Sequence, residues 1–131
     1  MKLLWLLASL GALAASDVSR SQAASPSAPT DPPLPISSGR YTFQHRFAEH
    51  PGMRSMALNA VIQGRRIRIT NPRATNVFPR GLLAEGELAW HARSGSWIIA
   101  GTPEDVEAAE VGGCSEGPEV VDLINRIYWT C

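Results

Sequence analysis

Apolar and polar residues alternate with a period of two along much of the chain after residue 39. This period is typical of β-strands that bury one face. One face of residues 40–47 carries three aromatic side chains and one histidine: Tyr41, Phe43, Phe47 and His45. The turn sequence His50-Pro51-Gly52 ends this first predicted strand.

Residues 55–70 predict a β-hairpin around the two-residue loop Gln63-Gly64. That loop pairs Ala60 with Ile67 and gathers the apolar residues on one face, while Arg66 and Arg68 fall on the other. Residues 71–80, with the sequence NPRATNVFPR, follow as the longest predicted loop of the domain. Prolines near both ends of this loop separate it from the strands around it.

Residues 85–101 form a second predicted hairpin, in which Ser94-Gly95 is the two-residue loop and Trp90 pairs with Ile99. The apolar face of this hairpin collects Leu88, Trp90, Trp97 and Ile99. The opposite face takes Glu87, His91 and Ile98. Because the first face is strongly apolar, the hairpin is expected to anchor the core.

The last thirty residues predict one short helix and a final strand. Thr102 can cap a helix near residues 103–110, Pro103 suits its first position and Asp105 can reach back to the cap. Residues 119–131 then alternate again, with an inward face made of Val121, Leu123, Ile127 and Trp129. Residues 119–125 also fit one or two helical turns.

Together these segments predict an all-β fold. We expect an antiparallel meander of six or seven strands that curls into a small barrel or half-barrel, with one short helix near residues 103–110. In outline this arrangement is similar to calycin-type barrels. The resemblance is one of architecture: Gly39-Arg40-Tyr41 differs from the lipocalin opening Gly-x-Trp, and no family is assigned.

The first third of the chain predicts export rather than a folded unit. A basic start, an eleven-residue apolar run and small residues make residues 1–15 a predicted signal peptide, too short to span a bilayer as a helix. Residues 16–38 hold five of the ten prolines and predict a disordered tether, with a partner-binding proline motif as the alternative. Residues 39–131 form the predicted single β-domain, in the periplasm or outside the cell.

The two cysteines, Cys114 and Cys131, are expected to form a disulfide. An even number of cysteines in an exported chain makes a disulfide the default. Because Cys131 is the last residue, the bond would hold the final strand in place. A two-cysteine metal site and an intermolecular bridge are the alternatives.

Charge divides the domain into a basic and an acidic part. Residues 40–80 hold eight arginines and one acid, whereas residues 81–131 hold two arginines and nine acids. The basic face of Arg65, Arg66 and Arg68 is a candidate for contact with an anionic partner such as a cell-surface polymer. The alternative, which we favour, is that basic and acidic strands pair with each other. A nucleic-acid partner is not expected for an exported protein.

The chain contains no recognisable catalytic motif. His45 and His50 flank Glu49 but lie five positions apart and so on opposite strand faces, which argues against joint metal ligation. No metal and no cofactor are expected. His45 is either a hydrogen-bonded core residue or the polar contact of a ligand pocket.

Three functions therefore compete. The first is a non-catalytic exported domain that binds a small apolar ligand or an envelope or extracellular macromolecule, with candidate ligand-binding residues Tyr41, Phe43, His45, Trp90, Trp97 and Trp129. The second is an inhibitor of a secreted enzyme that acts through residues 71–80. The third is a small hydrolase-like enzyme that uses His45 with a nearby acid.

Overall fold

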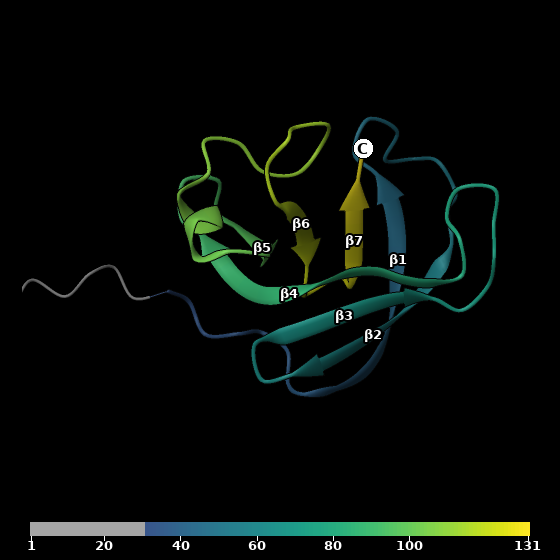
Figure 1. Cartoon of the computed structure of the whole chain (residues 1–131), viewed down its shortest axis with the longest axis horizontal. Coiled ribbons are helices and arrows are strands. Elements are labelled where there is room, and N and C mark those ends of the chain that lie inside the picture. The colour runs from purple at the N-terminus through teal and green to yellow at the C-terminus, as the bar shows by residue number, and fades with distance from the viewer. Residues whose placement is uncertain (1–30) are drawn as a thin grey trace, which may run out of the picture.

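A computed structural model describes residues 31–131, and in this part of the chain seven strands form one sheet that closes on itself (Figure 1). The finding confirms the all-β meander predicted from the alternation. In sequence order the strands are β1 Gly39–Phe47, β2 Ala57–Gln63, β3 Arg66–Asn71, β4 Gly81–His91, β5 Ser96–Ala100, β6 Glu119–Asp122 and β7 Ile127–Thr130.

The ring closes by pairing its first and last strands. Each consecutive pair of strands is antiparallel, so in a seven-strand meander β1 and β7 must run in the same direction. These two strands pair in parallel from Gln44 with Ile127 to Phe47 with Thr130, and Figure 1 shows their arrows pointing the same way. Closure satisfies the strand edges that an open sheet would expose.

Both predicted hairpins form, but each register differs from the prediction by two residues. Gln63 pairs with Arg66, so the first loop is Gly64-Arg65 and Ala60 pairs with Ile69. Gly64 occupies the left-handed region at φ 60°, which a tight two-residue turn needs. A shift of two keeps every side chain on its predicted face, because side chains alternate with a period of two.

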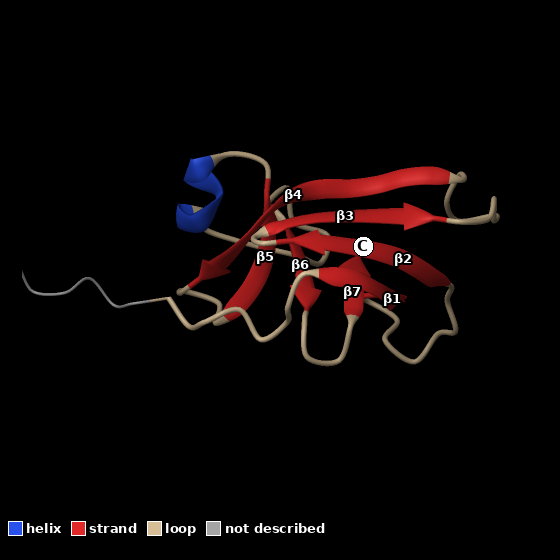
Figure 2. Cartoon of the chain, turned by 90° about the horizontal axis from the view of Figure 1, so that it is seen from below, coloured by secondary structure: helices blue, strands red, loops and turns tan. Residues whose placement is uncertain are grey.

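The second hairpin has a four-residue loop at residues 92–95, so Trp90 pairs with Trp97 instead of Ile99. The predicted inner face is again preserved. The opposite face is not open to solvent, however: His91 and Ile98 are fully buried. The segment that follows, with the 3₁₀ helix η1 Pro103–Glu107, packs beside β4 and β5, as Figure 2 shows. The His91 Nε2 lies 2.7 Å from the carbonyl oxygen of Ala108 in this segment.

The last segment forms a hairpin, β6 and β7, and corrects the predicted face of one aromatic residue. The Asp122 carboxylate accepts hydrogen bonds from the backbone N–H groups of Ile124 and Asn125, which fixes a turn where a continuous strand or a helix was predicted. The turn places Tyr128 opposite Val121 and buries it in the core, whereas Trp129 is only half-buried. The prediction that Trp129 faces inward is therefore wrong.

Side chains fill the interior of the ring. A single cluster of buried side chains joins every strand, with Phe43, Leu58 and Leu88 fully shielded from solvent. Leu34 and Ile36, which precede β1, are half-buried and pack against this cluster. The end of the predicted tether, residues 31–38, thus lies on the domain; the rest of the tether and the predicted signal peptide lie outside the described residues.

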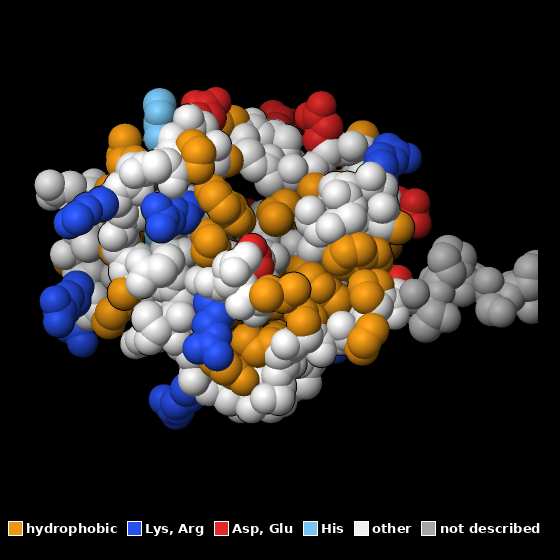
Figure 3. All heavy atoms as spheres, turned by 180° about the vertical axis from the view of Figure 1, so that it is seen from behind, with side chains coloured by type: hydrophobic (Ala, Val, Ile, Leu, Met, Phe, Trp, Pro, Cys, Tyr) orange, Lys and Arg blue, Asp and Glu red, His pale blue; other side chains and the backbone are white. Residues whose placement is uncertain are grey.

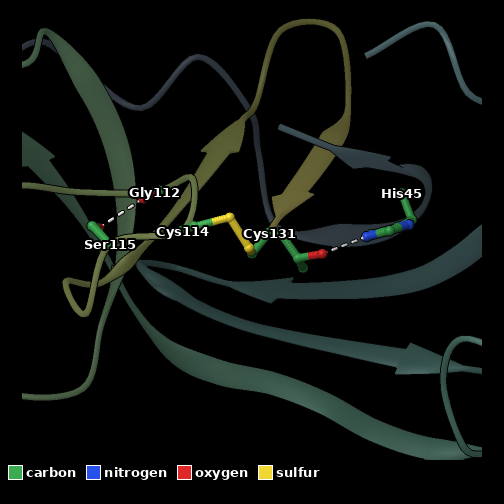
Figure 4. Close-up of a disulfide and its surroundings, with 6 residues drawn as sticks. His45, Gly112, Cys114, Ser115 and Cys131 are labelled. Atoms are coloured by element: carbon green, nitrogen blue, oxygen red, sulfur yellow. Dashed lines mark hydrogen bonds between the residues drawn. A yellow bond between two sulfur atoms is a disulfide. The ribbon is translucent and has the colours of Figure 1, made fainter. Parts of the chain in front are cut away.

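Cys114 and Cys131 form the predicted disulfide, with 4.6 Å between their Cα atoms (Figure 4). The bond ties the C-terminal end of β7 to the connection between η1 and β6. Nearby, the Ser115 hydroxyl donates to the Gly112 carbonyl at 2.7 Å and shapes the same connection.

Replacing both cysteines by serine (C114S/C131S) is expected to lower the free energy of unfolding by about 3 kcal/mol. The bond joins residues 17 positions apart, and in the chain-entropy model a loop of this size restricts the unfolded chain by about that amount. Urea unfolding of the oxidised protein and the variant measures the difference. A change below about 0.5 kcal/mol would contradict the expectation.

Candidate functional site

Three tryptophans gather around one open cavity, which we call the tryptophan pocket. Its volume is about 520 Å³, and its walls come from the β4–β5 and β6–β7 hairpins and from the segment before β1. The aromatic lining consists of Trp90, Trp97 and Trp129. The proline lining consists of Pro32, Pro33 and Pro35. Figure 3 shows hydrophobic side chains gathered in one patch on the surface of the domain.

The tryptophans are held by the sheet rather than by loops. Trp90 and Trp97 are cross-strand partners whose rings lie 5.4 Å apart in an edge-to-face arrangement with an interplanar angle of 65°. Aromatic pairs favour this geometry. Trp97 is only 7% exposed, so it forms the floor of the pocket, and Trp129 of β7 forms a side. Ile124, which is 77% exposed, stands at the rim.

The polar groups of this pocket are few and occupied. Asp122 lines the pocket, but its carboxylate accepts three hydrogen bonds within the β6–β7 turn, including one from the Asn125 side chain at 2.8 Å. The pocket therefore presents mainly carbon surface, which suits an apolar ligand.

The structure brings together three of the six predicted ligand-binding residues. Trp90, Trp97 and Trp129 share the tryptophan pocket, whereas Phe43 and His45 belong to the filled interior. Tyr41 does not line the pocket; it is half-buried, packs against the core cluster, and its hydroxyl donates to the Ser37 carbonyl at 2.7 Å. The prolines were missed as lining residues, although three prolines in four positions before the first strand were a signal that this segment could present a stiff apolar surface.

His45 joins several elements at the other end of the ring. Its two ring nitrogens hydrogen-bond to Ser55 Oγ and, at 2.8 Å, to Thr130 Oγ1. Figure 4 shows His45 at one of these bonds. The rings of Phe47 and Phe78 pack edge-on against it with centroid distances of 4.6 and 4.8 Å. The side chain is 1% exposed, and this burial lowers the pKa of His45 below its ordinary value. No carboxylate is among these contacts, and the use of His45 by a hydrolase stays a prediction.

The connection between β3 and β4 is held by its own polar side chains. The buried Asn71 amide donates to the carbonyls of Phe78 and Pro79 at 3.3 and 3.2 Å. Thr75 Oγ1 accepts the backbone N–H groups of Val77 and Phe78. These bonds give residues 71–80 a defined shape. That residues 71–80 inhibit a secreted enzyme stays a prediction.

Two arginines of the basic face pair with one acid of the neighbouring strand, Glu85. Arg68 lies opposite Glu85 and contacts it at 2.8 Å, and Arg66 contacts the same carboxylate at 3.5 Å. Arg65 donates to the Leu88 carbonyl at 3.3 Å. This cross-strand pairing is the alternative that the sequence favoured, and anion binding by these three arginines stays a prediction.

Two further observations concern the described residues alone. In residues 31–131 no group of three or more histidine, cysteine or acidic side chains is placed to hold a metal ion. No helix in the same part of the chain is long and apolar enough to cross a membrane. No family model, curated protein or solved structure matches the chain, so its function is argued from geometry.

Proposed function

We propose that this protein is an exported, non-catalytic binding domain that takes a small apolar ligand in the tryptophan pocket. The observation that carries the proposal is the convergence of Trp90, Trp97 and Trp129 on one apolar cavity of about 520 Å³. Ligand pockets typically enclose roughly 300–1,000 Å³ and are lined mainly by apolar and aromatic side chains.

The aromatic lining of the pocket favours a flat or ring-shaped ligand. Ring faces of tryptophan bind other rings by offset or edge-on stacking, and the proline segment supplies a wall that loses little entropy on binding because prolines are already stiff. The centre of the ring has no room for such a ligand, because Phe43 and Leu58 fill it and are fully buried. The site therefore lies at the surface, and a ligand can enter without opening the sheet.

Export is supported by two independent features. The leader sequence of residues 1–15 has the three parts of a signal peptide. The Cys114–Cys131 disulfide is compatible with an oxidising compartment.

Titration with the uncharged aromatic probe N-phenyl-1-naphthylamine is expected to quench tryptophan emission and to raise probe emission in a saturable way. The three tryptophans of residues 31–131 all line the pocket, so their fluorescence reports on this site directly. Replacing the rim residue Ile124 by aspartate is expected to raise the Kd of the probe about tenfold, because a charge at the mouth opposes entry of an apolar ring. Ile124 is 77% exposed, so the fold should tolerate the change.

A matched control is Val77→Asp, which places the same charge on an exposed apolar residue in the β3–β4 connection, away from the pocket. This control is expected to leave the Kd unchanged. Absence of saturable binding, or equal effects of the two aspartates, would disprove the tryptophan pocket as the site.

A further inference from the structure

The domain carries a set of arginines that its own acids do not neutralise. Within residues 31–131 the ion pairs join Arg66 and Arg68 to Glu85, whereas Arg54, Arg73 and Arg80 are exposed and form none. These three lie in the connections on either side of β2 and β3, the β1–β2 and β3–β4 connections. Arg40, Arg93 and Arg126 are also exposed without an ion pair in this range, and Glu49 lies in the β1–β2 connection. The three arginines of the two connections are therefore one cluster of the unpaired positive charge, away from the basic strand face that the sequence indicated.

Exposed apolar side chains occur at the same end. Met53, Val77 and Leu82 are 49%, 46% and 52% exposed. Each has an arginine close in the chain: Arg54 follows Met53, Arg80 lies two positions before Leu82, and Val77 lies between Arg73 and Arg80. We call these six residues the arginine end.

The two connections form one unit rather than two independent loops. Thr75 Oγ1 of the second connection donates to Met56 Sδ at the end of the first, at 3.7 Å. His45 hydrogen-bonds to Ser55 of the first connection and packs against Phe78 of the second. The views in Figures 1 and 2 agree that both connections lie on one side of the molecule, with η1 on the other.

We propose that the arginine end binds an anionic lipid surface. Guanidinium groups bind phosphate in a bidentate manner, and apolar side chains beside them can reach below the headgroups. A protein interface usually has a more apolar core inside a polar rim. Here apolar residues and arginines are interleaved, which matches the headgroup region, where charge and hydrocarbon lie within a few ångströms of each other.

The distribution of acids would orient the bound molecule. Glu104, Asp105 and Glu107 lie on or beside η1, on the side away from the arginine end (Figure 1). An anionic surface repels these carboxylates and attracts the three arginines. The tryptophan pocket opens between the β4–β5 and β6–β7 turns, at the other end of the ring, and would stay accessible.

The test is sedimentation of the exported chain with vesicles of phosphatidylglycerol mixed with phosphatidylcholine, and with vesicles of phosphatidylcholine alone. We expect binding to the anionic vesicles only, weakened by salt. The triple variant R54Q/R73Q/R80Q is expected to lower the partition coefficient roughly 100-fold, since each arginine near an anionic surface contributes about a fivefold gain. The variant V77S/L82S is expected to lower it as well, without any change in charge.

The matched control is R65Q/R66Q/R68Q, which removes the same three charges from the paired strand face. It should retain most of the binding. Equal loss in the two triple variants would show that only net charge matters and would overturn the proposal. So would failure to bind anionic vesicles, unchanged binding by V77S/L82S, or equal binding to both vesicle types. The probe titration at the tryptophan pocket is independent of all these outcomes.

Discussion

Replacing His45 by alanine is expected to lower the free energy of unfolding by about 4 kcal/mol, as for large-to-small changes of a buried aromatic ring. The ring is 1% exposed, so its removal leaves a cavity between Phe47 and Phe78. It also leaves two half-buried hydroxyls, of Ser55 and Thr130, without their partner. Urea unfolding measures the loss, and hydrogen exchange is expected to rise in residues 48–56 and 71–80.

The same contacts predict a dependence on pH. Because burial lowers the pKa of His45 in the folded protein, the unfolded chain binds a proton at a higher pH than the folded chain does. The stability due to neutral His45 is therefore complete above about pH 6.5 and is lost as the pH falls from there through the folded pKa. The slope cannot exceed about 1.4 kcal/mol per pH unit, the value for one proton. Burial also raises the pKa of the neighbouring Tyr128, so its hydroxyl carries no charge that could offset this loss.

Two variants separate this effect from general acid sensitivity. His45→Gln keeps a polar side chain but cannot be protonated, so its unfolding free energy should lack the loss below about pH 6.5 that is expected for the histidine. His50→Ala removes an exposed histidine of the β1–β2 connection and should change stability by less than about 0.5 kcal/mol. If His45→Gln and the unaltered protein follow the same pH curve, His45 is not the titrating group.

The faces of the strands could be predicted from the sequence because a period-two pattern survives errors of register. Both hairpin registers differ by two residues from the prediction, and Leu88, Trp90 and Trp97 still lie on one face. The prediction for the last segment was wrong because Asp122 fixes a turn after β6. The next strand, β7, then begins with its Tyr128 side chain facing inward. Alternation across residues 119–130 alone does not reveal where such a turn interrupts the strand.

The candidate site was predicted in part. The sequence predicted that the tryptophans lie on the inner, apolar face of the sheet. It could not show that other side chains fill the interior, so that the tryptophans line a pocket at one end of the ring. The free arginines were missed for a related reason. The alternation of residues indicated that Arg66 and Arg68 share a face. Whether an arginine forms an ion pair depends on the strand that lies beside it, however, and here Glu85 of β4 lies opposite Arg68 and pairs with it.

Replacing Gly86 by alanine is expected to destabilise the fold by more than the roughly 3 kcal/mol of ordinary overpacking. A Cβ at this position would lie 2.5 Å from the Ala100 carbonyl oxygen and 2.8 Å from Ile99 Cγ2, distances that require the backbone to move. The close approach has a structural cause. Strand β4 pairs with β3 up to Glu87 and with β5 from Glu87 onward, and Figure 1 shows that it curves strongly along its length. A glycine inside a strand pattern is the signal that marks such a bend.

Gly52→Ala is the matched control, because a Cβ there meets nothing within 4 Å. It should change the unfolding free energy by less than about 0.5 kcal/mol. If Gly86→Ala unfolds at the same urea concentration as Gly52→Ala, β4 can relax without its glycine and the bend is not what closes the ring. If Gly86→Ala is strongly destabilised, the tryptophan pocket depends on this residue as well, since the half of β4 that follows the bend carries Trp90. Probe binding and folding should then be lost together.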